Sequence, residues 1–269
     1  MGHIKVGITG IAGRMGREIA SCVHENPALR LAGGTERPGH ALIGTDAFGA
    51  LGLGTGGPKI ASHLKEIIND VDVIIDFSTP EATMEHFAVC RAAGKGIVIG
   101  TTGFSAEQVK EMDSHRAAIR CVRAPNMSIG VNVLFKVLAD AARILGKSYD
   151  IEIMEIHHNL KKDSPSGTAM RLAEICARET GRSLDSVGVY GRHGITGERT
   201  KDEIAVMALR MGDVVGEHTV YFAGQGERVE LTHKAASRRN FAAGAVRAAE
   251  WLAGQKNGTY DMQDVLGLK

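Results

Sequence analysis

The stretch IKVGITGIAGRMG, residues 4–16, decides the fold of this chain. Its first five residues alternate loosely between apolar and polar types, as in a short buried strand, and a helical pattern of apolar residues follows through Val23. The three glycines suit a turn that reverses tightly, lets a diphosphate approach the backbone and packs a helix closely against a strand. Their GxxGxxG spacing is a variant of GxGxxG with the same mechanics. The stretch therefore predicts the opening strand, turn and helix of a dinucleotide-binding domain.

An acidic residue stands where such a domain binds the ribose of its cofactor. A second apolar strand over residues 29–32 leads to Glu36, which follows the glycines by about 20 residues, the distance at which a carboxylate hydrogen-bonds the ribose hydroxyls. The neighbouring Arg37 carries a guanidinium that can hold a 2′-phosphate. The pair predicts tolerance of both NADH and NADPH. The alternative interpretation is a solvated Glu–Arg pair in a loop.

Strands and helices continue to alternate up to residue 126. Strands are expected over residues 71–77, 96–99 and 119–122, with helices between them, one of which begins at Pro80. Such alternation implies a parallel sheet whose ligands bind at the carboxyl ends of the strands. The turn Gly100-Thr101-Thr102-Gly103 would let a flat nicotinamide ring approach the backbone, whereas Ser78-Thr79-Pro80 fits ordinary turn chemistry better.

The organisation changes after Asn126 and predicts a second domain. A strand is expected over residues 149–156, a helix from about Ser166, and a loop over the glycine-rich residues 188–197. Three strands then follow closely, over residues 203–210, 217–222 and 228–232, joined by glycine-containing segments that suit hairpins. They predict an antiparallel or mixed sheet. The final helix has Ala-rich faces that can pack back onto the first domain, which places the domains at residues 1–126 with 238–269, and at 127–237.

The segment EIHHNLKKDSPSGT, residues 155–168, concentrates imidazoles, ammonium groups and a helix start. Imidazole and ammonium groups hold carboxylates and deliver protons near neutral pH, and the free N–H groups of a helix start favour anions. The segment predicts a polyanion-binding site that carries its own acid. Because neighbours in a strand point to opposite faces, His157 and His158 can both serve only if the strand ends there; otherwise one of them is structural. Lys162 is expected to be solvated.

Composition excludes several other classes of function. The 269 residues are 43% hydrophobic, enough for a substantial core, and the net charge of +1 comes without a basic stripe that would indicate nucleic acid. The four cysteines are widely separated and form no CxxC pair, which argues against disulfides and zinc and for reduced thiols in the cytoplasm. No apolar run approaches the roughly 20 residues of a membrane span.

Taken together, these motifs resemble those of the dihydrodipicolinate reductases. The resemblance extends over essentially the whole chain, and its most specific part is the segment of residues 155–168 joined to the nucleotide turn. It rests on Gly10–Arg17, Asp76–Ser78, Gly100–Phe104, Asn126, Ser128–Asn132, Glu155–Thr168, Gly191–Gly197, Gly216–Thr219 and Thr232–Ala235.

The resemblance implies an α/β protein with an N-terminal Rossmann-like domain and a C-terminal α+β domain, with a mixed sheet, for substrate binding and oligomerisation. The implied reaction reduces 4-hydroxy-tetrahydrodipicolinate, a small dicarboxylate, to tetrahydrodipicolinate in lysine and diaminopimelate biosynthesis, with NADH or NADPH, in a homotetramer. His157 and Lys161 would be the catalytic acids, and the substrate would bind His158, Ser166, Gly167 and Thr168. The cofactor would contact Gly10, Ile11, Ala12, Gly13, Arg14, Met15, Glu36, Arg37, Gly100, Thr101, Thr102, Ala124, Pro125, Asn126 and Met127. Many relatives carry an aromatic residue in place of Met127, so the contact beneath the nicotinamide is expected to differ.

Two other classes of function would use parts of the same pattern. A non-catalytic NAD(P)-binding sensor on the same fold would keep the glycines and Glu36 but would not need an anion site at Lys161 and His158. A metal hydrolase using the histidine pair is disfavoured, because adjacent histidines are a poor ligand set and no matching cluster of carboxylates or cysteines follows.

Overall fold

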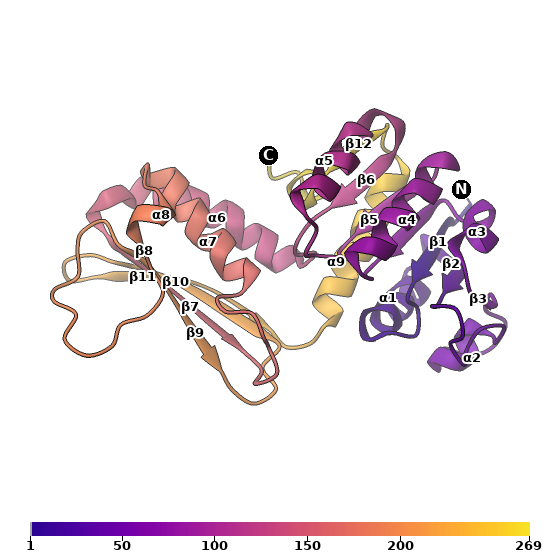
Figure 1. The fold of residues 1–269 in the computed structure, drawn as a ribbon, viewed down its shortest axis with the longest axis horizontal. Coiled ribbons are helices and arrows are strands. Elements are labelled where there is room, and N and C mark those ends of the chain that lie inside the picture. Colours follow the sequence, from indigo (N-terminus) through magenta and orange to yellow (C-terminus); the bar gives the residue numbers. More distant parts are fainter. Residues whose placement is uncertain (1) are drawn as a thin grey trace. The chain divides into compact units, whose positions relative to one another are not determined.

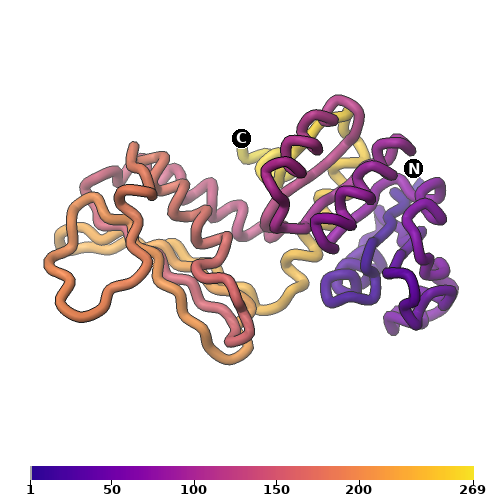
Figure 2. The backbone as a smooth tube through the Cα atoms, viewed as in Figure 1, coloured from indigo at the N-terminus to yellow at the C-terminus, as the bar shows by residue number. Residues whose placement is uncertain are grey.

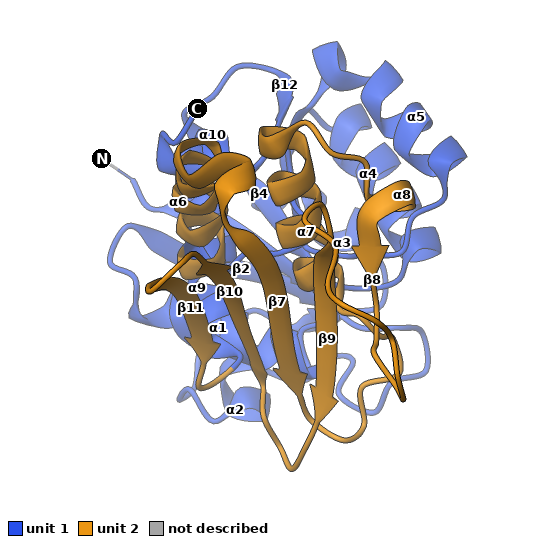
Figure 3. Cartoon of the chain, turned by 90° about the vertical axis from the view of Figure 1, so that its left-hand side faces the viewer, with its two compact units in different colours: residues 1–129, 238–269 blue, residues 130–237 orange. Residues whose placement is uncertain are grey.

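The computed structural model describes residues 2–269, which form two compact units (Figures 1 and 2). The first comprises the residues up to Ile129 together with Arg238–Lys269, and the second comprises Gly130–Ser237 (Figure 3). Each unit has its own hydrophobic core, two clusters in the first and one in the second.

The first unit contains a parallel seven-stranded sheet in the order β12-β6-β5-β4-β1-β2-β3. Because β1 lies beside both β2 and β4, the strand order reverses at β1, which is where doubly wound sheets bind ligands. The strands are β1 (Ile4–Thr9), β2 (Leu29–Thr35), β3 (Ile60–Ala61), β4 (Val73–Asp76), β5 (Gly96–Ile99), β6 (Arg120–Arg123) and β12 (Gly258–Tyr260).

Helices cover both faces of this sheet (Figure 1). One face packs on α1 (Arg14–Glu25) and α9 (Arg239–Ala253), and the other on α3 (Leu64–Ile67), α4 (Pro80–Ala92) and α5 (Ala106–Ser114). The short α2 (Ala47–Leu51) and α10 (Met262–Leu266) complete the unit. The helix starts follow local chemistry: Pro80 occupies the first turn of α4 behind the capping hydroxyl of Thr79, and Ser105 and Gln108 form a capping box at α5.

The second unit contains a mixed five-stranded sheet in the order β11-β10-β7-β9-β8. The central strand β7 pairs in parallel with β9 and antiparallel with β10. The helices α6 and α7 pack on one face of the sheet (Figure 3). The elements are α6 (Ile129–Leu145), β7 (Asp150–His157), α7 (Gly167–Thr180), α8 (Leu184–Val187), β8 (Gly188–Val189), β9 (Ile204–Arg210), β10 (Gly216–Ala223) and β11 (Arg228–Ala235).

The sheet of the second unit corrects two local predictions. The segment between β9 and β10 is not a hairpin turn, because β7 lies between these two strands, whereas β10 and β11 do form an antiparallel hairpin. Gly188 and Val189, expected in a loop, form the edge strand β8 beside β9. Turn-forming residues indicate that the chain reverses direction. They do not indicate whether an earlier strand lies between the two strands that the turn connects.

Candidate active-site residues

The glycine turn after β1 has the geometry that an anion-binding helix start requires. Gly10 has a φ of +62°, in the left-handed region that glycine adopts without strain. A Cβ on Gly16 would lie 2.2 Å from the carbonyl oxygen of Gly10, so only glycine permits this close approach. Gly13 is the N-cap of α1 and brings no side-chain acceptor, and the first turn of α1 holds no acidic side chain. The N–H groups there fit a phosphate.

Glu36 contacts this turn directly. Its Oε1 accepts a hydrogen bond from the backbone N–H of Ala12 at 2.8 Å, and its Oε2 accepts from the N–H of Arg37 at 3.3 Å. Since a carboxylate offers about four acceptor sites, Glu36 can hold the turn and still accept from ribose hydroxyls. The side chain of Arg37 is exposed beside it. The residues present therefore fit a dinucleotide.

The remaining candidate cofactor residues follow β5 and β6, at the same edge of the sheet. Gly100, Thr101 and Thr102 come directly after β5, and residues 124–127 come directly after β6. The side chain of Met127 is 1% exposed within the core, and its carbonyl oxygen packs so closely on Gly244 of α9 that a Cβ there would lie 1.8 Å away. Met127 therefore contributes backbone rather than side chain to this edge.

In the second unit, Glu155 is the centre of the candidate site. The carboxylate is fully buried on β7 and accepts hydrogen bonds from the guanidinium of Arg210 at 2.8 and 2.9 Å, and from the backbone N–H of Ser166 at 3.0 Å. His157 Nδ1 lies 2.6 Å from its Oε2. Burial alone would raise the pKa of Glu155, but the hydrogen bonds from Arg210 and His157 outweigh it and lower the pKa. The site thus holds a carboxylate that stays ionised.

The imidazole of His157 is enclosed by its neighbours. Its side chain is 12% exposed, and its ring meets the ring of His218 edge-on at 5.2 Å between centroids. A Cβ on Gly216 would lie 3.0 Å from its Nε2, so the glycine makes room for the ring. Burial lowers the pKa of His157 despite the opposing effect of the hydrogen bond that its Nδ1 makes to the carboxylate of Glu155. Burial, and then the neighbouring His157, lower the pKa of His218 to about 3.

The other predicted residues gather around the start of α7. Strand β7 ends at His157, so strand alternation does not extend to His158. Lys161 Nζ lies 2.9 Å from both carboxylate oxygens of Asp163. Ser166 caps α7 by accepting from the N–H of Ala169, and its hydroxyl lies 3.0 Å from Nε2 of His218. Gly167 and Thr168 are the first two residues of the helix.

Within residues 2–269, two buried nitrogens of this cluster, Nδ1 of His158 and Nδ1 of His218, have no hydrogen-bond partner. A buried polar atom left unpaired costs about 1–3 kcal/mol. A bound anion or hydroxyl would remove that cost. The cluster therefore combines cations, helix N–H groups and an unsatisfied imidazole, which is the donor set that a small carboxylate needs.

Arg210, Gly216 and His218 did not stand out as site residues in the sequence. Arg210 lies beside His157 on β9, and His218 lies opposite Glu155 on β10, so sheet pairing brings both to the site. The available signal was the sequence of residues 216–219, which formed part of the family resemblance but had no assigned role.

Comparison with known families agrees with this geometry. The family model for the N-terminus of dihydrodipicolinate reductase matches residues 4–127, and the model for its C-terminus matches residues 130–266. The chain belongs to the dihydrodipicolinate reductase family.

Two relatives illustrate how far the similarity extends. The 4-hydroxy-tetrahydrodipicolinate reductase of Syntrophobacter fumaroxidans is 50% identical over 99% of this chain and 100% of its own length. The enzyme of the same name from Hahella chejuensis is 52% identical over 98% of this chain and 99% of its own. Alignments of this length extend over both units.

Solved structures share the fold at lower identity. A dipicolinate-bound dihydrodipicolinate reductase from Paenisporosarcina is 24% identical, with a TM-score of 0.75 over 98% of this chain and 99% of that chain. An amine dehydrogenase from Mycobacterium smegmatis is 12% identical, with a TM-score of 0.60 over 96% of this chain and 94% of that chain. These likenesses show the fold alone.

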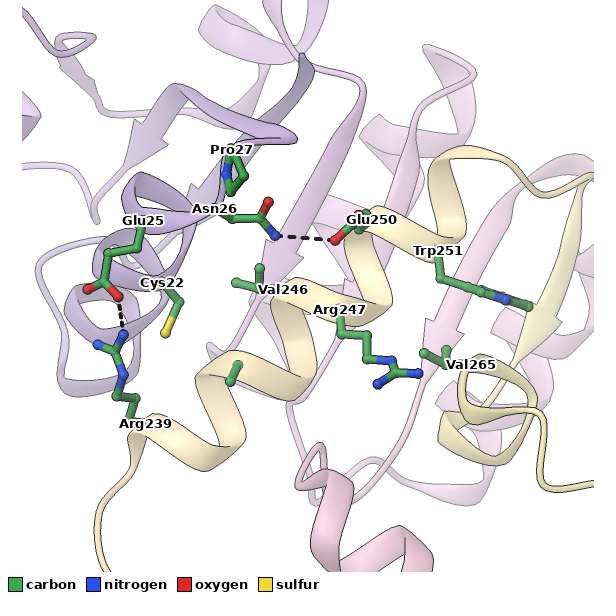
Figure 4. A pocket seen from close by; sticks show the side chains of 11 residues that line it. Cys22, Glu25, Asn26, Pro27, Arg239, Val246, Arg247, Glu250, Trp251 and Val265 are labelled. Atoms are coloured by element: carbon green, nitrogen blue, oxygen red, sulfur yellow. Dashed lines mark hydrogen bonds and ion pairs between the residues drawn. The ribbon is translucent and has the colours of Figure 1, made fainter. Parts of the chain in front are cut away.

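Other features of the described chain lie apart from the candidate residues. A surface pocket of about 850 Å³ lies at the C-terminal end of α1, between α9 and α10, and is lined by residues such as Cys22, Arg247 and Trp251 (Figure 4). The glycine turn is at the opposite end of α1. Residues 2–269 hold no group of three or more His, Cys, Asp or Glu side chains arranged to bind a metal. Of the helices in this range, none has the length and apolarity of a membrane span.

Proposed function

We propose that this protein reduces 4-hydroxy-tetrahydrodipicolinate to tetrahydrodipicolinate with NADH or NADPH, in lysine and diaminopimelate biosynthesis. The observation that carries the proposal is full-length identity of about 50% to reductases of that name, in a chain that keeps both a dinucleotide turn and a separate anion site. A non-catalytic sensor would need only the first of these.

The first unit is proposed to bind the cofactor, which supplies the hydride. The N–H groups at the start of α1 would hold the diphosphate, and Glu36 the adenosine ribose. The exposed Arg37 would contact the 2′-phosphate of NADPH. Residues after β5 and β6 would line the nicotinamide half: Gly100, Thr101, Thr102, Ala124, Pro125, Asn126 and Met127.

The second unit is proposed to bind the dicarboxylate through His158 and the start of α7. Ser166 accepts from Ala169, and this hydrogen bond fixes the start of α7, whose first residues are Gly167 and Thr168. The start of a helix favours an anion. Lys161 and His157 would act as the acids. The side chain of Lys161 pairs with Asp163, whose own side chain is 64% exposed, so an incoming carboxylate can compete for the ammonium group.

Glu155 is proposed to set the protonation pattern of His157. An ionised Glu155 favours the tautomer with the proton on Nδ1, which leaves Nε2 as the atom that gains and loses a proton. General acid catalysis of this kind is typically worth about 10²–10⁴-fold in rate. The proton would quench the electron density left on the ring when hydride is added.

The proposed cofactor domain comprises residues 1–126 and 238–269. The proposed domain for substrate binding and oligomerisation comprises residues 127–237. In support of a homotetramer, the sheet face opposite α6 and α7 carries Met154, Ile156, Met207 and Leu209, and Leu209 is 40% exposed. Such a face can pack on its copy in another subunit. The cytoplasm is the proposed location.

The test is oxidation of NADPH by the purified protein, with substrate generated in situ by a synthase from pyruvate and aspartate semialdehyde. Rapid oxidation that depends on the synthase is expected, with NADH run in parallel and EDTA without effect. Binding of NADPH without oxidation would instead support the sensor, and loss of activity in EDTA would support a metal enzyme.

A further inference from the structure

A fully buried carboxylate lies at the nucleotide edge of the first unit, the edge of the sheet that carries the glycine turn after β1 and the loops after β4, β5 and β6. It has no part in the proposed function. Asp76 ends β4 after three buried apolar residues and is 0% exposed. Removing a carboxylate from water costs several kcal/mol unless hydrogen bonds compensate it. The residues around Asp76 must therefore supply hydrogen bonds to its carboxylate.

Both oxygens of Asp76 are occupied by residues from two different loops and a helix. Oδ1 accepts from the hydroxyl of Ser78, in the loop after β4, at 2.5 Å, and from the hydroxyl of Thr101, in the loop after β5, at 3.5 Å. Oδ2 lies 2.7 Å from Nδ1 of His86 on α4. The carboxylate thus joins three segments at one point.

A second row of hydrogen bonds reinforces the first. The hydroxyl of Thr83, also on α4 and 0% exposed, donates to the hydroxyl oxygen of Thr101 at 2.9 Å. The backbone N–H of Ser78 donates to the same oxygen at 3.0 Å. Thr101 can then donate its own proton only towards Asp76. Thr83 and Ser78 thus donate to Thr101, and Thr101 donates to Asp76. The negative charge of the carboxylate therefore orients the hydroxyl groups of this network.

The two loops also contact each other through apolar atoms. The ring of Phe77 lies on the backbone of Gly100, where a Cβ would come within 2.2 Å of the ring. The loop after β4 and the loop after β5 are therefore packed directly against each other. In the strand order they lie on the side of β1 away from β2 and Glu36. A dinucleotide spans such an edge with one half on each side of the reversal point.

We propose that Asp76 is a positioning residue for the nicotinamide half of the cofactor, acting through Ser78 and Thr101. Its carboxylate holds the two loops in the spacing that the nicotinamide ring requires. Because β2 and Glu36 hold the adenosine half independently, loss of the carboxylate affects one half of the cofactor only. The proposal rests on the proposed use of NAD(P)H.

The test compares two probes that differ only by the nicotinamide ring. NADH and ADP-ribose are titrated against the wild type, Asp76→Asn and Thr83→Val. The amide of Asn keeps the shape but offers one acceptor atom instead of two, and Thr83 is too deeply buried to touch a ligand. We expect both variants to bind NADH roughly 5- to 10-fold more weakly, the effect of about one hydrogen bond, while their affinity for ADP-ribose stays within about twofold of the wild type. In turnover, the KM for NADH rises and the KM for the dicarboxylate does not.

A matched control is Asp72→Asn. The carboxylate of Asp72 accepts from the N–H of Lys5 at 2.9 Å, just before β4 and at the opposite end of that strand, so this variant should bind both probes as the wild type does. Equal weakening of NADH and ADP-ribose by Asp76→Asn, or no weakening of either, overturns the proposal. If Asp76→Asn does not fold, Thr83→Val decides by the same comparison. A wild type that binds NADH without turnover overturns the proposed reaction, and the binding comparison still decides the role of Asp76.

Discussion

Nδ1 of His157 lies 2.6 Å from Oε2 of Glu155, two residues before it on the same face of β7. The same carboxylate holds Arg210 by two hydrogen bonds and the N–H of Ser166 by a third. One buried side chain therefore fixes the orientation of the imidazole and ties the start of α7 to the sheet. In the proposed reaction, the orientation of His157 therefore depends on a residue that need not touch the substrate.

Replacing Glu155 with Gln should separate this role from cofactor binding. The amide keeps the shape but leaves Arg210 and His157 without their negative partner, so we expect kcat to fall roughly 10- to 100-fold and the free energy of unfolding to fall by about 2 kcal/mol or more. NADPH affinity should not change. Glu152→Gln is the control, since Glu152 pairs with Arg192 and Arg199 instead. Wild-type kcat in Glu155→Gln would contradict the assignment.

His157 and His218 make stability dependent on pH. The pKa of His157 is lowered, and that of His218 is lowered to about 3, both by burial. Below about pH 6.5 the unfolded chain binds protons that the folded chain does not, so stability falls as pH falls. Above that pH the contribution is fully present. Glu155 keeps its contribution through this range, because its lowered pKa is reached only in more acid solution.

His218→Gln should flatten this dependence. Between pH 6.5 and 5 we expect the slope of unfolding free energy against pH to decrease by up to ~1.4 kcal/mol per pH unit, the effect of one proton. Urea unfolding at several pH values measures the slope. The exposed His193 provides the control variant His193→Gln. An unchanged slope in His218→Gln would mean that His218 is not neutral in the folded protein.

The nucleotide edge could be predicted from the sequence because its signals are local. The glycines and Glu36 lie within one unit of β1, α1 and β2, and their spacing can be read directly from the sequence. The contact between Glu36 and Ala12, at 2.8 Å, lies within that unit. The role of Asp76 could not be predicted, since its partners are fixed by how β4, β5 and α4 pack.

The site of the second unit was predictable only in part. The segment 155–168 supplied Lys161 and both histidines, but Arg210 reaches Glu155 from 55 residues away through sheet pairing. The prediction of a hairpin between β9 and β10 was also wrong, because β7 lies between these two strands. The alternation argument left His157 and His158 undecided, and the end of β7 at His157 removes that constraint.

Lys161→Ala should lower kcat by about 10²-fold or more while NADPH affinity stays near wild type. The reason is that Lys161 is an ammonium group of the second unit, whereas the candidate cofactor residues belong to the first. Lys162→Ala is a close control, because Lys162 is the next residue and is exposed. An equal loss of cofactor affinity in fluorescence titration would remove Lys161 from the substrate site.

Arg37→Ala should weaken NADPH more than NADH, because only NADPH carries the 2′-phosphate. A charged hydrogen bond is worth about 1.5–3 kcal/mol, so the ratio of the two dissociation constants should change roughly 10- to 100-fold. The exposed Arg30 on β2 gives the control Arg30→Ala. If the KM ratio for the two cofactors does not change, Arg37 is a solvated surface residue.

Gly16→Ala tests whether the glycine turn is built for close packing rather than for flexibility. The added Cβ would lie 2.2 Å from the carbonyl oxygen of Gly10 and 2.7 Å from the backbone of Ile11, and backbone atoms cannot move aside as a side chain can. The start of α1 must therefore shift, and its N–H groups would no longer point toward the diphosphate. We expect both NADH and ADP-ribose to bind at least roughly tenfold more weakly, with a lower Tm.

Gly49→Ala in α2 is the control. Its added Cβ would lie 3.8 Å from Oδ1 of Asp46, which is an ordinary van der Waals distance. The comparison also distinguishes this turn from the Asp76 group. Gly16→Ala should weaken both probes together, since the diphosphate is common to them, whereas Asp76→Asn should weaken NADH alone. If Gly16→Ala binds ADP-ribose as the wild type does, the diphosphate does not sit at the start of α1, and the assignment of Gly10–Met15 to the cofactor fails with it.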